Sequence, residues 1–299
     1  MTLTELFQAF DLHLTLKHRS GATLRYYANT RASLERHFAE SPIGEAPLAE
    51  HVTINQLRQF VAWLEVSGLG SGGIHAHVRA VRDLFNWAVK EEMLEKSPAK
   101  RLELPALPQK RQPAVMAIGV KKLLEAARGT DQPLRDRALL LTLFDTGVRV
   151  SELVGLCFED VLFEQGLLRV QGKGNKERFV PVGARAMDEI VRYRRKERNP
   201  KHAGVHHVFL SRGGRLMTRS GISIRLTLLA RAVGIGREQA APHAFRRGFA
   251  VEFLRNGGDV FTLQQILGHT SLEMTRRYVT FLDEDLKSAH LRFSPVDRM

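Results

Sequence analysis

The chain has 299 residues, which is enough for one large domain or two ordinary ones. Its apolar content of 43% and charged content of 26% are typical of a soluble globular protein, and its longest apolar run, residues 138–144, is too short to span a bilayer. The single cysteine, Cys157, excludes an intramolecular disulfide and a cysteine-based zinc site. Together with a beginning that lacks a basic leader, it predicts a cytoplasmic protein.

Positive charge is concentrated in one part of the chain. There are 45 Lys and Arg residues against 32 Asp and Glu, a net charge of +13. Residues 1–105 contain 12 basic and 12 acidic side chains, so residues 106–299, with 33 and 20, carry the whole excess. Such an excess indicates a surface for a polyanion, and nucleic acid is favoured over a membrane because the chain has no amphipathic basic helix or lipidation signal. A basic protein without such a partner is the alternative.

The first hundred residues are predicted to be wholly helical, because apolar residues recur at helical spacing from Leu3 onward. Amphipathic helices are expected over residues 3–14, 20–38, 54–66 and 75–92, with the glycines at residues 68–73 interrupting the chain before the last of them. Four such helices joined by short loops predict a small bundle in residues 1–105. The cations of this bundle that could face DNA phosphates are Arg25, Arg79 and Arg82. For each of them a solvated surface position is an equally good interpretation.

A proline-rich segment separates this bundle from the rest of the chain. The sequence LPALPQKRQP, residues 104–113, has three prolines and no periodic apolar pattern, which predicts an extended linker over residues 106–113. A second domain is expected over residues 114–299.

The second domain is predicted to combine helices with one small antiparallel sheet. Helices are expected over residues 120–127, 134–145, 148–153, 184–198 and 219–233, and Gly147 should end the second of them. Two apolar stretches, residues 167–171 and 178–182, flank the glycine-rich residues 172–175 and therefore predict a β-hairpin. Residues 158–162 could add an edge strand. The expected fold class is mainly α with a small antiparallel β-sheet.

The stretch PHAFRRGFAVEFLRNGGDVFTLQQILGHTSLEMTRRY, residues 242–278, gathers reactive residue types at short spacing. Proline is favourable in the first turn of a helix, and His243 and Arg246, three apart, would share one face of the helix that follows. Gly268 should end a second short helix and leave His269 on a turn, with Tyr278 about two turns into the next helix. Cations and imidazoles around one tyrosine indicate chemistry on an anion.

Metal chemistry is not expected. Three histidines at residues 202, 206 and 207 lack cysteine or carboxylate companions, and no dense acidic cluster could hold magnesium. A hydrolase that uses two metal ions is therefore disfavoured, and no cofactor is predicted.

The runs TGVRVSELVGL, GKGNKER, PHAFRR and LGH, followed by Tyr278, resemble the tyrosine recombinase (phage integrase) family in residue type, order and spacing. The resemblance implies a helical, SAM-like core-binding domain followed by a mixed α/β catalytic domain, which together form a C-shaped clamp around duplex DNA. The catalytic residues that it implies are Arg149, Lys173, His243, Arg246, His269 and Tyr278. Taken singly, each has a structural interpretation; Arg149, for example, could pair with Glu152. Their joint presence favours catalysis.

The resemblance also implies a chemical role for each residue. Tyrosine can attack a phosphodiester and later leave, so the bond energy is kept in a covalent link and no ATP is needed. Two arginines would neutralise the transition state, and the lysine would protonate the leaving 5′ oxygen. His243 would accept the phenol proton, and His269 would hydrogen-bond the phosphate. Further DNA contacts are expected from Arg219 and Arg225.

Several hypotheses within and outside this family stay open. The length and GKGNKER resemble the Xer chromosome-dimer resolvases, whereas Arg247 and the tail HLRFSPVDRM favour an integrase of a mobile element. Family members assemble as tetramers on DNA by exchanging a C-terminal helix, here residues 282–291. A type IB topoisomerase-like enzyme and a non-catalytic DNA-binding protein are the alternatives from other classes.

Overall fold

The computed structural model describes the chain except for residues 42–46, 108–111, 173–176, 280–289, 291–293 and 298–299. The chain forms two compact units, Met1–Lys110 and Arg111–Met299. Within the described residues, no helix has both the length and the apolar character needed to cross a membrane.

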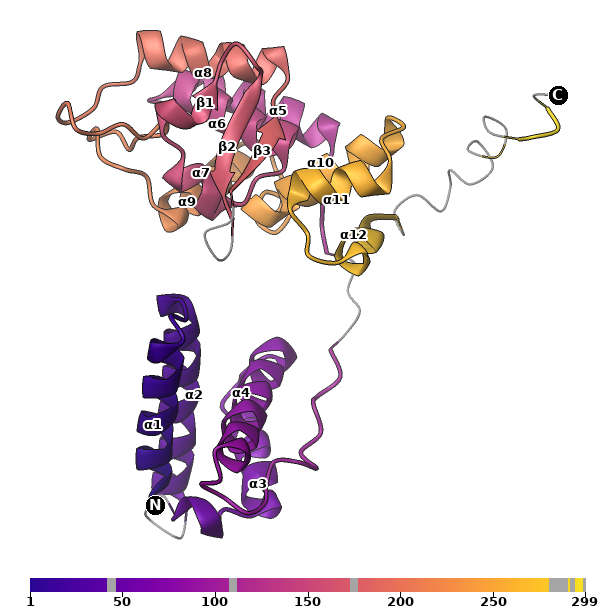
Figure 1. Ribbon diagram of the computed structural model, residues 1–299. Coiled ribbons are helices and arrows are strands. Elements are labelled where there is room, and N and C mark those ends of the chain that lie inside the picture. Colours follow the sequence, from indigo (N-terminus) through magenta and orange to yellow (C-terminus); the bar gives the residue numbers. More distant parts are fainter. Residues whose placement is uncertain (42–46, 108–111, 173–176, 280–289, 291–293, 298–299) are drawn as a thin grey trace. The chain divides into compact units, whose positions relative to one another are not determined.

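The N-terminal unit is a bundle of helices, as the apolar spacing predicts. Its α-helices are α1 (Leu3–Leu16), α2 (Gly21–Glu40), α3 (Ile54–Val66) and α4 (Ser71–Lys90), with a short 3₁₀ helix at Ala49–His51 (Figure 1). Thr2 and Thr53 begin α1 and α3 with capping boxes, each of which satisfies two free backbone N–H groups. The buried faces of all four helices form one apolar core.

Helix α4 begins earlier than the sequence predicts. The glycines at residues 68–73 were expected to interrupt the chain, yet Gly72 and Gly73 lie inside α4, and Gly70 is its N-cap residue. The intrinsic cost of a helical glycine is about 1 kcal/mol. The apolar face of α4, which is buried from Ile74 to Ala88, outweighs that cost.

The second unit, Arg111–Met299, contains the residues expected to be catalytic and is called the catalytic unit here. It is built around α6 (Pro133–Thr146), which is buried on nearly all sides and packs against α5 (Ala117–Arg128) and α8 (Ala184–Lys196). This agrees with the leucine-rich helix expected at residues 134–145. The remaining helices of the unit are α7 (Val150–Gly155), α9 (Arg219–Ala232), α10 (Pro242–Arg255), α11 (Val260–Leu267) and α12 (Leu272–Val279).

The sheet contains the predicted hairpin. Strands β2 (Leu167–Gln171) and β3 (Glu177–Pro181) pair antiparallel, with Leu168 opposite Val180, and both of these side chains are buried. The expected edge strand is much shorter than predicted. Residues 158–160 form a 3₁₀ turn, and only β1 (Val161–Leu162) joins the sheet, in the order β1-β2-β3. The fold class, mainly α with one small antiparallel sheet, is confirmed.

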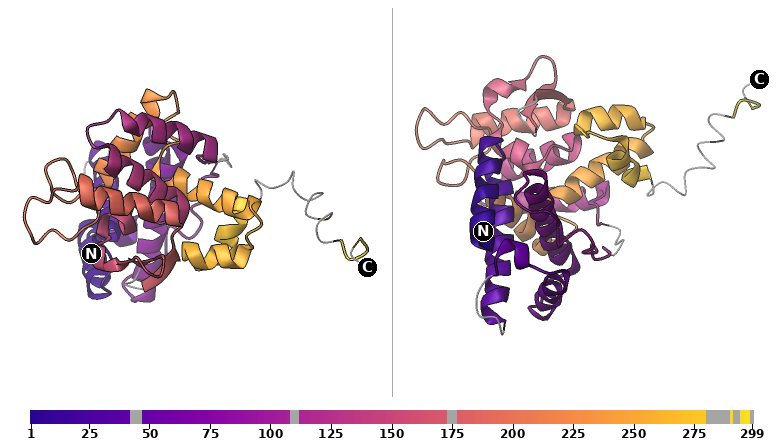
Figure 2. Two further views of the ribbon diagram at one scale, coloured as in Figure 1. Left: turned by 90° about the horizontal axis from the view of Figure 1, so that it is seen from above. Right: turned by 60° about the horizontal axis from the view of Figure 1, so that its bottom comes forward.

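Helices α10, α11 and α12 form a group at one end of the catalytic unit (Figure 2, gold). Pro242 occupies the first turn of α10, as its fixed φ predicts. Two glycines in the left-handed conformation, Gly147 after α6 and Gly268 after α11, end their helices where the sequence predicts. Both glycines lie beside the residues expected to be catalytic.

Candidate active site

Short segments from different parts of the catalytic unit meet around one buried cation, Arg246. It projects from α10 and is only 5% exposed. Its Nη1 donates to the carbonyl of Gly147 at 2.7 Å, and its Nη2 donates to the carbonyl of Leu267 at 2.6 Å. These carbonyls belong to the ends of α6 and α11, so the arginine joins three helices.

The environment of Arg246 opposes its charge. Burial, followed by the nearby positive charge of Arg149, lowers the pKa of Arg246 to about 10. With this pKa the guanidinium is still protonated at neutral pH. Its hydrogen-bond partners in the described part of the chain are two neutral backbone carbonyls, which hold it in place without compensating its charge. A glycine is required at position 147, because a Cβ there would lie 2.5 Å from Cδ1 of Phe249, and the backbone φ is +59°.

A second group of charges surrounds Glu152, on the first turn of α7. The side chain of Glu152 is 2% exposed, and it receives Nη1 of Arg149 at 2.8 Å and the backbone N–H of Arg149 at 2.7 Å. Arg178 of β3 donates Nη1 and Nη2 to the two oxygens of the same carboxylate, at 2.8 and 2.9 Å. Burial opposes ionisation, but these hydrogen bonds outweigh it and hold the pKa of Glu152 below its ordinary value.

Arg149 therefore pairs with Glu152, which is the structural role that the sequence allowed for it. The pairing leaves the side chain of Arg149 31% exposed. Arg178 is the last residue of the run GKGNKER, but the sequence predicted no role for it, because its partners lie 26 and 88 residues away in the chain.

The two histidines are both held in the neutral form. Burial, and then Arg246, Arg149 and Arg178, lower the pKa of His269 to about 4. His243 keeps an exposed face, and partial burial followed by Arg247 and Arg246 lowers its pKa below the ordinary value. Neutral imidazoles can accept a proton, which a base in this position requires.

Tyr278 lies half-buried on α12, about two turns into the helix as predicted. Its ring packs against the small apolar cluster of Ala250, Leu263 and Leu267, and it stacks on His269 with 6.1 Å between ring centroids. Nδ1 of His269 lies 2.9 Å from Oγ1 of the buried Thr275. Both rings lie close enough to Arg246 to interact with it electrostatically.

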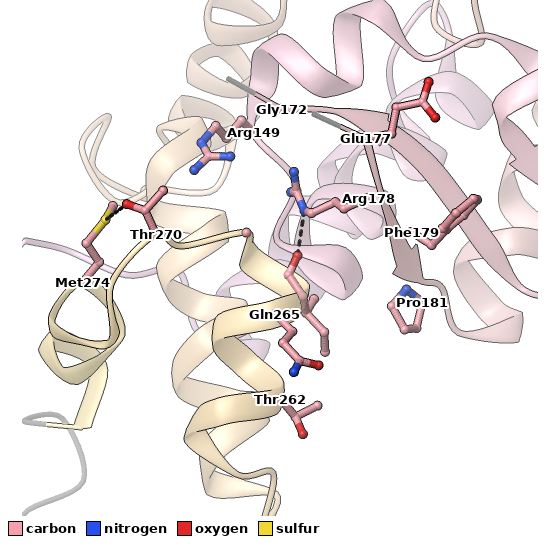
Figure 3. Close-up of a pocket in the computed structure, with 12 residues that line it drawn as sticks. Arg149, Gly172, Glu177, Arg178, Phe179, Pro181, Thr262, Gln265, Thr270 and Met274 are labelled. Carbon is pink, nitrogen blue, oxygen red and sulfur yellow. Dashed lines mark hydrogen bonds between the residues drawn. The ribbon is translucent and has the colours of Figure 1, made fainter. Parts of the chain in front are cut away.

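A cavity of about 840 Å³ opens beside this group, between β3 and the ends of α11 and α12. Arg149 and Arg178 both line it, together with Thr270 and Met274 (Figure 3). Gly268 also lines it. The cavity gives a ligand access to Arg149 and Arg178.

The structure therefore brings together Arg149, His243, Arg246, His269 and Tyr278. These residues and Arg178 supply three guanidiniums. Arg149 and Arg178 pair with the one carboxylate of Glu152. Among the described residues, Arg246 donates only to backbone carbonyls. Such a surplus of fixed cations can hold an anion and stabilise the charge that develops on it. Lys173 and nearly all of the expected exchange helix, residues 282–291, lie outside the described residues.

The candidate DNA contacts fall into two groups. Arg25, Arg79 and Arg219 are exposed, and Arg82 is partly exposed. Arg225 differs from them, because its side chain is 18% exposed and it is ion-paired with Asp131 and Asp136. Its charge is thus committed within the protein.

Comparison with known proteins agrees with this geometry. The sequence profile of the phage integrase family matches residues 117–284, and that of the phage integrase SAM-like domain matches residues 5–104. The tyrosine recombinase XerD of Yersinia pestis is 34% identical over 281 residues, which cover 88% of this chain and 94% of that protein. XerD of Halalkalibacterium halodurans is 31% identical over 250 residues, 83% of either chain.

The fold is also found among solved structures. The Tn1549 transposon integrase in complex with transposon right end DNA superposes with a TM-score of 0.78 over 93% of this chain and 94% of that one, at 20% sequence identity. The two matched profiles and the near full-length relatives lead to one conclusion. The chain belongs to the phage integrase family, the tyrosine recombinases, which are enzymes that cleave and rejoin DNA at specific sites.

Proposed function

We propose that Tyr278 is the nucleophile of this recombinase and that Arg149 and Arg246 bind the phosphate that it attacks. The observation that carries this proposal is the surplus of guanidiniums beside a tyrosine whose ring stacks on a neutral histidine. The phenol oxygen forms a bond to the 3′ phosphorus while the bond from phosphorus to the 5′ oxygen breaks. Rejoining is the reverse attack by a 5′ hydroxyl, so the two strand ends are exchanged without ATP.

Proton transfer follows from the same geometry. His243, with its lowered pKa and exposed face, accepts the phenol proton. His269 donates a hydrogen bond to the phosphate, and its Nδ1 contact with Thr275 fixes the ring orientation. The leaving 5′ oxygen takes its proton from Lys173, a role that rests on the family resemblance alone. The arginine pair neutralises the charge of the transition state and is worth about 3–4 kcal/mol for each aligned donor group.

The test is trapping of a covalent intermediate. The full chain is incubated with nicked duplexes whose short 5′ fragment diffuses away after cleavage, so that rejoining is prevented. Wild type should form a DNA adduct that withstands SDS, and Tyr278→Phe should form none. An adduct of normal yield with Tyr278→Phe would exclude the proposed nucleophile.

The class of target site separates two functions within the family. The similar curated proteins are named tyrosine recombinase XerD and XerC, which favours an Xer-type dimer resolvase. Arg247 and the C-terminal tail favour an integrase of a mobile element, and the matched fold of the Tn1549 integrase is compatible with that. The two functions can be distinguished with two nicked duplexes, one made from the chromosomal dimer-resolution site and one from DNA that flanks the gene. The covalent adduct should form on the first duplex for a dimer resolvase and on the second for an integrase.

We further propose that residues 1–105 form a core-type DNA-binding domain, joined through residues 106–113 to a catalytic domain at 114–299. The exposed Arg25, Arg79 and Arg219, with the partly exposed Arg82, would contact phosphates, so that affinity falls steeply with salt. Four copies are expected to assemble on two sites in the cytoplasm by exchange of residues 282–291. Deletion of residues 284–299 should abolish the pairing of two sites but not the binding of one.

A further inference from the structure

We propose that Arg178 is a positioning residue of the recombination reaction, because its guanidinium locks Arg149 and the His269 turn into one rigid arrangement. This inference rests on the proposed function. All three side-chain nitrogens of Arg178 are engaged. Nη1 and Nη2 contact the carboxylate of Glu152 at 2.8 and 2.9 Å, and Nε donates to the carbonyl of Ile266 at 3.0 Å.

The first link runs from Arg178 through Glu152 to Arg149. Bidentate pairing fixes the plane of the Glu152 carboxylate, because both of its oxygens accept from the same planar fork. The same two oxygens accept the backbone N–H and Nη1 of Arg149. The orientation of the Arg149 guanidinium therefore depends on a carboxylate that Arg178 holds. Without Arg178, the carboxylate could rotate about its side-chain torsions, and Arg149 would follow it.

The second link runs from Arg178 to the turn that contains His269. The carbonyl of Ile266 is one of the last in α11, where backbone acceptors lack intrahelical partners, and Arg178 satisfies it. The next turn packs directly on the same side chain. A Cβ at Gly268 would lie 3.0 Å from both Cδ and Nε of Arg178, so the backbone rests against the guanidinium stem. His269 follows immediately.

Position and charge distinguish Arg178 from an ordinary core arginine. Its side chain is 15% exposed and lines the cavity that Arg149 also lines (Figure 3). Its positive charge also contributes to lowering the pKa of His269 and of Arg246. The same residue thus sets the geometry and the field of the site, although it contacts neither Tyr278 nor Arg246 by any hydrogen bond found among the described residues.

A substrate that does not need an aligned arginine separates positioning from folding. Nicked duplexes are prepared with the ordinary scissile phosphate or with a methylphosphonate, in which a methyl group replaces one non-bridging oxygen and removes the negative charge. Arg178→Met, Arg178→Lys, Arg149→Ala and the wild type are compared in single-turnover formation of the covalent adduct. Thermal unfolding of each variant is measured alongside.

We expect Arg178→Met to cleave the ordinary phosphate about 100-fold more slowly than wild type, the size of effect that a small misplacement of a catalytic group produces. The methylphosphonate should restore most of the lost rate, as it should for Arg149→Ala. Arg178→Lys should behave like Arg178→Met, because one ammonium group cannot bridge Glu152 and Ile266 together.

The matched control is Arg169→Met on the neighbouring strand β2. Arg169 is ion-paired with Asp160 and lies outside the site, so its loss should leave the rates on both substrates as in wild type. An unchanged rate for Arg178→Met, or an equal loss on the two substrates, would overturn the proposal. Failure of the proposed function would be visible separately, as an adduct formed by Tyr278→Phe or none formed by wild type.

Discussion

The catalytic unit contains two clusters of largely buried arginines that use the same residue type for opposite purposes. In the balanced cluster, Arg135 and Arg225 face Asp136 and Asp131, and the contacts include 2.8 Å from Arg135 Nη2 to Asp136 Oδ1. In the site cluster, Arg149 and Arg178 share the carboxylate of Glu152. The neighbouring Arg246 donates only to backbone carbonyls within the described part of the chain. Among these residues, only the site cluster has positive charge left over for a ligand.

The pKa values of two arginines show the difference. Burial acts to lower the pKa of both Arg225 and Arg246. For Arg225, hydrogen bonds to Asp136 and Asp131 outweigh burial and raise the pKa above its ordinary value. For Arg246, the charge of Arg149 adds to burial, and the pKa falls to about 10. Loss of one partner from the balanced cluster would leave a buried charge uncompensated, whereas the surplus charge of the site cluster is compensated only when an anion binds.

Removal of one arginine from each cluster gives the largest contrast. We expect Arg246→Met to slow adduct formation about 10²–10³-fold, because a donor aimed at the transition state is lost. Arg225→Met should leave the rate per folded molecule unchanged and should instead lower the free energy of unfolding. Single-turnover cleavage and urea titration measure the two effects. Equal losses of rate in the two variants would remove the distinction between the clusters.

Asp136→Asn tests the balanced cluster directly. Asp136 is fully buried. Among the described residues, its neutralisation leaves Arg135 without a charged partner and Arg225 with Asp131 alone, so it should reduce the free energy of unfolding by about 3 kcal/mol. The matched control is Asp131→Asn. That side chain is 41% exposed, and its loss should be less than about 1 kcal/mol. Urea unfolding of both variants measures the two losses in the free energy of unfolding.

The pH response of His269 reports the surplus charge. Because its pKa is about 4 in the folded protein and about 6.5 when unfolded, the unfolded chain binds the proton first as pH falls. The neutral ring therefore contributes fully to stability above pH 6.5, and this contribution, on the order of 3 kcal/mol, is lost toward pH 4. NMR titration of the ring should show the low pKa in DNA-free protein. A bound phosphate should raise it.

An inorganic anion should stabilise the site cluster alone. Phosphate at ten times its dissociation constant is expected to raise the free energy of unfolding of the wild type by about 1.4 kcal/mol. Arg246→Met should lose this gain, and Arg225→Met should keep it. Thermal shift assays at constant ionic strength, with chloride as the reference salt, separate specific binding from general screening. A gain of equal size in both variants would contradict a specific site.

Gly268→Ala should have the smallest effect. The backbone φ of +63° is unfavourable for alanine, and the new Cβ would press on Arg178, so a loss of about 1 kcal/mol in stability is expected. Gly213→Ala serves as the control, since no atom lies within 4 Å of the Cβ position there. Unfolding midpoints in urea compare the two. Equal values would show that the turn does not rest on Arg178.

Local physical rules explain what the sequence predicted well. Caps and stops depend on a few adjacent residues, so Pro242 at the beginning of α10 and Gly147 and Gly268 at helix ends could be assigned from the sequence. The alternating pattern of residues 167–171 and 178–182 likewise predicted the hairpin to within one residue. The predicted length of the edge strand was wrong, because a strand of two residues has almost no periodicity that a sequence could show.

The sequence by itself determined the helices, the hairpin, the family and the residues that the site brings together, since each is a matter of local spacing or residue type. Only the tertiary structure decided which charges are balanced. Arg225 was expected to face DNA, yet it pairs with Asp136, 89 residues away, and Arg178 joins β3 to Glu152 and to the end of α11. An arginine has the same local signature whether a carboxylate or solvent faces it. Only packing, which brings distant segments together, determines where positive charge is left over.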